Sequence, residues 1–254
     1  MLSNIQRSKP KPPHIVIYGT NKVGKSTFGA LAEKPVFIRT EDGTSNIEVD
    51  SFPLATSCKE VMSNLADLAT KPHDYKTVVI DSVDWLEPMI HRQICEEQKV
   101  KNLEAIGYGK GYVMAMDLWR EYLSALKYLR DEIGMTTIQI AHSEIKRFEN
   151  PETEAYDRYQ VKLHKMASDL ILEFADIIFF ANHFVGVTKN KQGFGQERVR
   201  AVGGGDRFLY SEERPAFKAG NRFGLPDQIP FDPKGEYWNV IKQHVPYYNQ
   251  KKGN

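Results

Sequence analysis

The sequence predicts an α/β fold with a mostly parallel central sheet, and two observations support this prediction. Short, strongly apolar runs recur along the 254 residues, and most are followed by segments whose apolar residues have helical spacing. Near-continuous apolar runs are typical of strands buried on both faces, as in parallel sheets covered by helices. A chain of this length can bury such a sheet in one large domain.

The strands can be assigned in order along this alternation. Runs rich in apolar and β-branched residues occupy residues 14–18, 36–39, 77–81, 136–141 and 176–184. The connections between them are long enough to hold helices. The strands are therefore expected to run parallel, because a crossover helix returns the chain to the same edge of the sheet.

Helical patterns fill the connections. A short helix follows the first strand, and Ser57 with Glu60 forms a capping-box pattern that opens a second helix. Further helices are expected at residues 85–99, 112–133 and 166–175, and antiparallel additions at residues 196–202 and 207–210. We therefore expect a flexible N-terminal arm (residues 1–13), a core (residues 14–235) and a C-terminal tail (residues 236–254).

Composition excludes several classes of protein. Lys and Arg number 34 against 33 Asp and Glu, so the formal charge of +1 gives no strong overall attraction for polyanions. No apolar run approaches the roughly 18 residues that span a bilayer, and the first residues lack the apolar region of a signal peptide. Cys58 and Cys95 are far apart and outside any metal-binding spacing. We expect a cytoplasmic protein that does not associate with membranes.

A phosphate-binding motif follows the first strand. Gly19-Thr-Asn-Lys-Val-Gly24-Lys25-Ser26 matches G-x-x-x-x-G-K-[ST], with a strand before it and a helix after it. In such loops the backbone N–H groups surround the phosphates, the lysine bridges them and the hydroxyl binds Mg²⁺. The competing interpretation is a glycine-rich turn without a ligand. The expected nucleotide-binding residues are Gly19, Thr20, Asn21, Lys22, Val23, Gly24, Lys25, Ser26 and Thr27.

An acidic residue closes the third strand. Asp81 follows the apolar run Val78-Val79-Ile80, so it is expected at the carboxyl edge of the sheet, where the phosphate loop also lies. There it would hold the hydration shell of a Mg²⁺ ion that Ser26 also binds. Alternatively, it only ends the strand or caps the next helix.

Several segments resemble the RecA recombinase core. Val79-Ile-Asp-Ser-Val83, with Leu86 and Pro88 behind it, resembles that family's Walker B segment. Phe37-Ile-Arg-Thr-Glu41, Gln139-Ile-Ala-His142 and Phe148-Glu-Asn-Pro-Glu-Thr153 resemble its catalytic-glutamate strand, its γ-phosphate sensor and the start of its second DNA-binding loop. The chain is most similar to the phage-encoded RecA-core ATPases associated with single-strand annealing. This implies a RecA-like P-loop NTPase fold, with antiparallel strands added at the C-terminal edge.

The resemblance also implies catalytic roles beside Lys25. Glu41 would polarise the attacking water, and Asp42 is the alternative carboxylate. His142 stands where the family most often has a glutamine, and its ring can donate a hydrogen bond to a phosphate oxygen. The competing interpretation is that Glu41 and Asp42 open a polar turn before Gly43 and that His142 is structural.

Two segments correspond to the family's loops for single-stranded DNA. The first is residues 100–112 and the second residues 143–165. Both interleave aromatic rings with cations, which suits binding of bases and phosphates. The second segment also carries acidic residues, and a solvated connector is the alternative for each of the two segments. The DNA-binding candidates are Lys101, Tyr108, Lys110, Tyr112, Lys146, Arg147, Phe148, Arg158, Tyr159 and Lys162.

The resemblance finally implies assembly. Lys218 and Arg222 are candidates for reaching the nucleotide of an adjacent subunit, which would make ATP hydrolysis depend on a ring or filament of identical subunits. The competing interpretation is that both are ordinary surface charges. We expect a Mg²⁺-dependent ATPase that oligomerises on single-stranded DNA and promotes annealing or recombination, with a single-strand-binding protein as a further candidate partner. Two alternatives stay open. One is a P-loop kinase of a small phosphate acceptor, and the other is a non-hydrolysing module whose assembly ATP switches.

Overall fold

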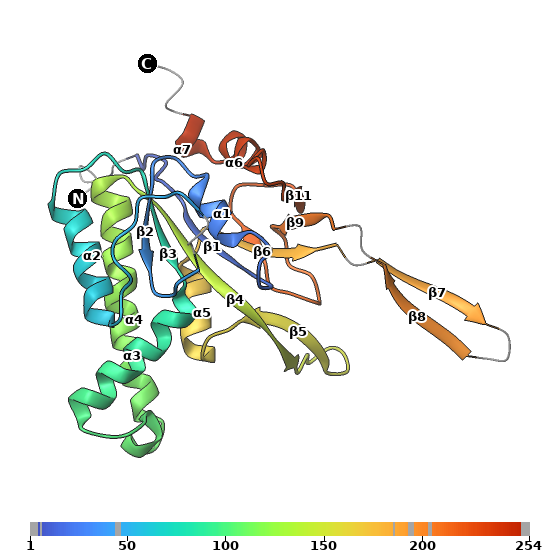
Figure 1. Cartoon of the computed structure of the whole chain (residues 1–254), viewed down its shortest axis with the longest axis horizontal. Helices are drawn as coiled ribbons and strands as arrows, with labels where there is room; N and C mark the ends of the chain where they lie inside the picture. Colours follow the sequence, from blue (N-terminus) through green and yellow to red (C-terminus); the bar gives the residue numbers. More distant parts are fainter. Residues whose placement is uncertain are drawn as a thin grey trace.

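The central sheet has the predicted mixed architecture. The computed structural model describes residue 5 and residues 7–43, 47–184, 186–192, 196–202 and 205–249. Within these residues, nine strands form one sheet, with the path β11-β9-β6-β1-β4-β3-β2 and with β10 and β5 paired to β6 and β4 (Figure 1). The parallel strands are β1 (His14–Gly19), β2 (Pro35–Arg39), β3 (Thr77–Asp81), β4 (Thr136–Phe148) and β6 (Ile177–His183). The fold-class prediction is confirmed.

Antiparallel strands complete the edge beyond β6. β9 (Arg207–Tyr210) and β10 (Gly220–Asn221) both pair with β6, and β11 (Gln228–Pro230) pairs with β9. β8 (Gln196–Val202) pairs instead with β7 (Gly186–Gln192) in a separate two-stranded sheet. Of the two predicted additions, residues 207–210 therefore join the main sheet and residues 196–202 do not.

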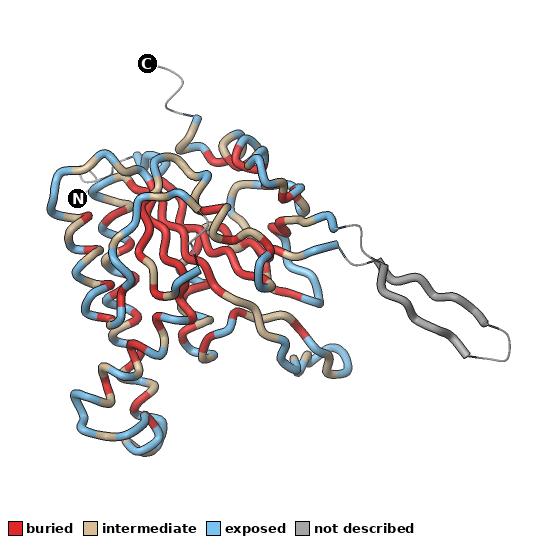
Figure 2. Tube along the Cα trace, in the orientation of Figure 1, coloured by how far each residue is buried: buried red, intermediate tan, exposed pale blue. Residues whose placement is uncertain are grey.

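Side chains of β1 point alternately into two hydrophobic layers, as the two-residue repeat of a strand requires. Val16 and Tyr18 belong to a cluster with buried residues of α2 (Cys58–Thr70), α3 (Val83–Gln98), α4 (Lys110–Tyr128) and α5 (Lys165–Phe174). Ile15 and Ile17 belong to the cluster formed with α1 (Lys25–Ala30) and α6 (Tyr237–His244). Figure 2 shows the resulting concentration of buried residues in the central strands.

The second predicted DNA loop is largely a β-hairpin. β4 continues past residue 141 to Phe148, and β5 (Tyr156–Val161) returns antiparallel to it, with Ser143 opposite Val161 and Phe148 opposite Tyr156. The extension was missed because polar side chains dominate it, so no apolar run marks it. Backbone pairing between the two strands supplies the order that an apolar run would otherwise indicate.

The first predicted DNA loop holds a short 3₁₀ helix, η2 (Leu103–Ile106), and the beginning of α4. α4 starts at Lys110, behind Gly109 with a φ of 70°, rather than at residue 112. It continues into a π-helical turn, η3 (Leu129–Ile133), which ends at Gly134 in the left-handed region with a φ of 81°. Glycine adopts this conformation without the steric cost that a Cβ atom brings.

The two ends of the chain contact the core where they are described. Lys11 of the arm pairs with Asp131 at 3.1 Å, while residues 1–4 and 6 lie outside the described part. In the region expected as a tail, α6 is followed by α7 (Pro246–Asn249), and Trp238 Nε1 donates a hydrogen bond to the Phe28 carbonyl oxygen at 3.1 Å. Residues 250–254 lie outside the described part. None of the helices described is both long and apolar enough to cross a membrane.

Candidate functional site

The phosphate loop connects β1 to α1 and is held closely against β6. A Cβ atom on Gly19 would lie 2.0 Å from the Ala181 carbonyl oxygen, so only glycine fits where the loop begins. Gly24 has a φ of 112°, which glycine tolerates without strain, and it directly precedes the helix. The sequence therefore has glycine at both points where the local backbone geometry excludes a larger residue.

Lys25 lies folded over the loop. The residue is 6% exposed, and Nζ donates hydrogen bonds to the carbonyl oxygens of Gly19 at 3.1 Å and Thr20 at 2.9 Å. Burial lowers the pKa of Lys25, whereas the nearby carboxylates of Asp81, Asp84 and Glu41 act to raise it. The ammonium thus lies beside the turn that the motif assigns to phosphates.

Ser26 and Asp81 meet across the end of the sheet. Ser26 Oγ donates a hydrogen bond to Asp81 Oδ2 at 2.7 Å, and Asp81 is 3% exposed. Burial raises the pKa of Asp81, although the Ser26 hydrogen bond and the charge of Lys25 oppose this. The expected neighbourhood of the two residues is therefore present in the structure.

This pair fits a Mg²⁺ ion that is bound together with a nucleotide. Within the described residues, no group of three or more His, Cys, Asp and Glu side chains is arranged to hold a metal by itself. Mg²⁺ commonly uses one or two carboxylates together with substrate phosphates and water. Ser26 and Asp81 would thus supply part of a coordination shell that a bound nucleotide completes.

His142 is held by a carboxylate that the sequence analysis did not identify. β4 pairs His142 with Gly19 of β1, which places it next to the phosphate loop. Asp84 accepts a hydrogen bond from the His142 backbone N–H at 3.0 Å, and its other oxygen lies 2.9 Å from His142 Nδ1. Burial acts to raise the pKa of Asp84, but hydrogen bonds and charge from His142 outweigh it, and the pKa is lowered. Asp84 lies three residues after Asp81, and no recognised motif marks it.

Glu41 is closer to this group than Asp42 is. Glu41 Oε1 lies 3.9 Å from His142 Nδ1 and its side chain is 19% exposed, whereas Asp42 is exposed. The preceding Thr40 fixes this end of β2: its Oγ1 donates to the Ser82 carbonyl oxygen at 2.6 Å and accepts from the Ser82 N–H at 2.8 Å. The ends of β2 and β3 are therefore bound to each other, which brings Glu41 to the same edge as Asp81.

Arg207 is a second residue that the sequence analysis missed. It lies on β9 and donates a hydrogen bond from Nη1 to the Val23 carbonyl oxygen at 3.0 Å. Its guanidinium also stacks on Phe231, with Cζ 5.7 Å from the ring centroid. A positive group from the same chain thus supports the phosphate loop from the antiparallel edge.

Lys218 and Arg222 contact opposite ends of two neighbouring strands, β1 and β6. The backbone of Lys218 exchanges two hydrogen bonds with the Tyr18 hydroxyl, which lies just before the phosphate loop. Arg222 instead pairs with Asp176, at the amino end of β6, through a 3.4 Å contact, and its side chain stays 67% exposed. The two residues therefore do not converge within one subunit, and their proposed contact with a neighbouring subunit stays a prediction.

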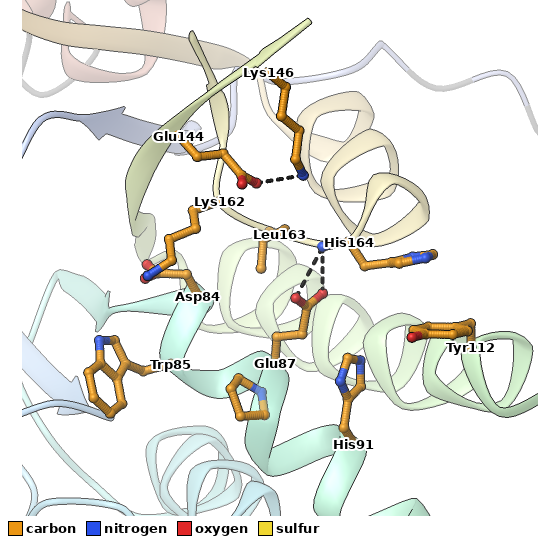
Figure 3. A pocket seen from close by; sticks show the side chains of 11 residues that line it. Asp84, Trp85, Glu87, His91, Tyr112, Glu144, Lys146, Lys162, Leu163 and His164 are labelled. Carbon is orange, nitrogen blue, oxygen red and sulfur yellow. Dashed lines mark hydrogen bonds and ion pairs between the residues drawn. The ribbon is translucent and has the colours of Figure 1, made fainter. Parts of the chain in front are cut away.

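The two predicted DNA segments meet at a cavity of about 510 Å³ beside α3. Tyr112 comes from the first segment and Lys146 and Lys162 from the second, and all three line it (Figure 3). The Tyr112 ring stacks on His164 with a centroid distance of 4.3 Å. Both Glu87 oxygens lie 3.0 Å from the His164 backbone nitrogen, and burial raises the pKa of Glu87. Asp84 also lines this cavity, so the cavity adjoins the residue that holds His142.

The remaining DNA-binding candidates are more dispersed. Lys101 lines a neighbouring cavity of about 370 Å³ with Tyr112, and the side chains of Tyr108 and Lys110 are exposed. Tyr159 packs towards the core, with its ring centroid 5.1 Å from that of Phe180. The other three candidates line a further cavity at the hairpin: Arg147, Phe148 and Arg158.

Comparisons with known proteins match a protein family over most of the chain. The family described as AAA domain matches residues 11–223. The chain is 29% identical over 136 residues to the SPbeta prophage-derived uncharacterized protein YorG of Bacillus subtilis (strain 168). That alignment covers 51% of this chain and 40% of the relative, so it spans less than half of the relative's length. A crystal structure of the RadB recombinase aligns with a TM-score of 0.47 and 14% identity, covering 90% of this chain and 91% of that one.

Proposed function

Because this chain belongs to the AAA domain family, we propose that it is a Mg²⁺-dependent ATPase that oligomerises on single-stranded DNA and promotes annealing or homologous recombination. The observation that carries the proposal is the 2.7 Å contact between Ser26 and Asp81 beside the buried ammonium of Lys25. A hydroxyl, a carboxylate and a lysine at one sheet edge form the group that phosphoryl transfer requires. The matched residues 11–223 include all of them.

The residues around the phosphate loop would have separate roles in hydrolysis. Lys25 and the loop backbone would hold the phosphates, and bound Mg²⁺ would neutralise charge on the transferred phosphoryl group. Glu41 would orient the attacking water, because a carboxylate accepts its proton or hydrogen bond. The position of Glu41 beside the loop favours hydrolysis over a module that binds ATP without turnover.

His142 would contact the γ-phosphate through Nε2, the ring nitrogen that does not face Asp84. Its Nδ1 faces Asp84, and an ionised carboxylate only accepts hydrogen bonds, so Nδ1 carries a proton. In neutral imidazole the other nitrogen is then an acceptor. Donation from Nε2 to a phosphate oxygen therefore requires a proton on both ring nitrogens.

The DNA-binding part of the proposal is supported by the cavity in Figure 3. It brings the Tyr112 ring and Lys162 together from segments that are separate in the sequence, and Lys146 beside them pairs with Glu144. Stacking surfaces next to cations suit a single strand.

A prophage-derived relative fits the phage-encoded group that the sequence resembles, and the reaction would then take place in the host cytoplasm. Arg222, whose side chain is 67% exposed, would complete the nucleotide site of an adjacent subunit.

A hydrolysis assay across protein concentrations tests this proposal. Phosphate release is measured with Mg·ATP, with and without single-stranded DNA, and after Mg²⁺ is removed with EDTA. We expect DNA to stimulate turnover, the specific activity to rise with protein concentration, and EDTA to abolish hydrolysis. Dependence on a small phosphate acceptor would indicate a kinase. ATP binding without turnover, unaffected by Glu41→Gln, would indicate a switched binding module.

A further inference from the structure

A cavity of about 610 Å³ lies between the β4–β5 hairpin, α5 and the segment that carries Glu213 and Lys218. None of the phosphate-loop residues 19–27 lines it. Its size lies within the roughly 300–1,000 Å³ typical of small-molecule sites. Its lining includes the apolar side chains Phe148, Val161 and Leu172, together with five cations and three carboxylates, a net charge of +2. The cavity therefore combines an apolar wall with an excess of positive charge.

Arg158 is the most buried charge in this cavity. The residue is 7% exposed, Nη2 donates a hydrogen bond to Glu213 Oε1, and Cζ lies 5.0 Å from the centroid of the Phe148 ring. Its Nε is buried and has no hydrogen-bond partner among the residues described. Leaving a donor of a buried cation unpaired is costly, so one carboxylate does not satisfy this guanidinium. An anion in the cavity would give the guanidinium a second acceptor beside Glu213.

Two lysines line the same cavity from other elements. Lys165 is at the start of α5, and Lys218 is held in place by the backbone hydrogen bonds to Tyr18. Neither ammonium forms an ion pair with another described residue, whereas Lys146 and Arg147 are paired with Glu144 and Glu149. Asp169 is the one lining carboxylate that is not paired with a cation in the part of the chain that the structure describes. Arg158, Lys165 and Lys218 are therefore available to bind an anion.

We propose that this cavity binds one nucleotide unit, with its phosphate on Arg158, Lys165 and Lys218 and its base against Phe148. A guanidinium and two ammoniums suit a phosphate group, and an aromatic wall suits the flat face of a base. The unit comes either from a free mononucleotide or from the phosphorylated end of a strand, which share this chemistry. An acidic peptide would match the cations but would leave the aromatic wall unused. This second nucleotide site is separate from the phosphate loop and does not depend on ATP hydrolysis.

Calorimetric titration of the full chain tests the proposal, and it uses the Lys25→Ala variant so that the phosphate loop is disabled. The ligands are dTMP, thymidine, and ten-residue oligothymidylates with a 5′-phosphate or a 5′-hydroxyl. We expect dTMP to bind at one site per chain and thymidine to bind at least about tenfold more weakly, because the charged contacts are lost. Preference for the 5′-phosphorylated oligonucleotide identifies a strand end, and binding of dTMP alone identifies a free nucleotide.

Substitutions in the lining locate the site. Lys165→Gln and Lys218→Gln should each weaken dTMP binding by about three- to tenfold, and Arg158→Gln by more. Arg158→Gln removes a buried partner of Glu213, so this variant can unfold. Lys165 and Lys218 are exposed or half-exposed, so the two lysine variants still test the site in that case. Lys59→Gln, on the distant α2, is the matched control. The proposal is overturned if dTMP shows no saturable binding or if thymidine binds as tightly as dTMP. It is also overturned if both lysine variants bind dTMP as the parent does, or if hexaglutamate competes as tightly as dTMP.

Discussion

The phosphate loop and the β4–β5 hairpin hold their functional side chains in different ways. Lys25 and Asp81 are buried, and both form hydrogen bonds within or next to the loop. In the hairpin, Ile145 is 60% exposed, and Lys146 pairs with a carboxylate two residues away. The first region is organised before any ligand arrives, whereas the second presents side chains at the borders of cavities. Substitutions should therefore affect chemistry sharply in the first region and affinity gradually in the second.

The largest expected effect comes from Lys25→Ala. Removing the ammonium should lower ATP affinity by about a hundredfold or more, because charged hydrogen bonds to phosphates are lost. The unfolding temperature without ligand should change by only a few degrees, at about 2–4 °C per kcal/mol for a chain of this size. Nucleotide titration and thermal unfolding measure the two quantities. Lys59→Ala is the control, and unchanged ATP affinity in the Lys25 variant would contradict the site.

Asp84→Asn should lower kcat by about tenfold to a hundredfold with little change in nucleotide Kd. The substituted amide would keep the shape of the side chain but lose the charged acceptor that faces His142 Nδ1. Steady-state kinetics give kcat and KM, and direct titration gives the nucleotide Kd. Unchanged kcat with only KM altered would indicate that Asp84 does not position His142 for hydrolysis.

Asp81→Asn should abolish most hydrolysis while stabilising the ligand-free protein by about 2–4 °C at pH 7. Burial raises the pKa of Asp81 in the folded chain, so folding is penalised while the carboxylate is charged. This penalty is complete when the pH is above the pKa of Asp81 in the folded chain. It disappears as the pH falls towards the lower pKa that Asp81 has in the unfolded chain. The stability difference between variant and wild type should therefore shrink on acidification. Thermal unfolding between about pH 7 and pH 4 measures it, and a difference that grows on acidification would contradict the sign.

The smallest expected effect is that of Tyr108→Ala. The side chain is fully exposed, so its removal should leave the unfolding temperature unchanged. Loss of one stacked base should weaken binding to single-stranded DNA by about five- to a hundredfold, since stacking contributes about 1–3 kcal/mol per base. Fluorescence anisotropy with a labelled oligothymidylate measures the affinity, and Tyr128→Ala, another exposed aromatic, is the control. Equal affinities would remove Tyr108 from the DNA-binding surface.

The sequence could predict those features that depend on residues close together in the chain. The buried strands are marked by apolar runs, and the phosphate loop by fixed spacing of glycines and Lys25. The hairpin carries no such mark, because its order comes from pairing between residues such as Ser143 and Val161. Asp84 and Arg207 have no local signal either. Their contacts with His142 and Val23 join residues 58 and 184 positions apart, and only the folded sheet brings them together.

The packing of Trp238 on Phe28 has a consequence for how the protein is made. The two residues are 210 positions apart, and the contact covers the short helix that carries Lys25 and Ser26. During synthesis the loop emerges early, yet the surface behind its helix stays open until the residues of α6 have left the ribosome. The phosphate loop therefore gains this support only after the 210 residues that separate Phe28 from Trp238 have been translated.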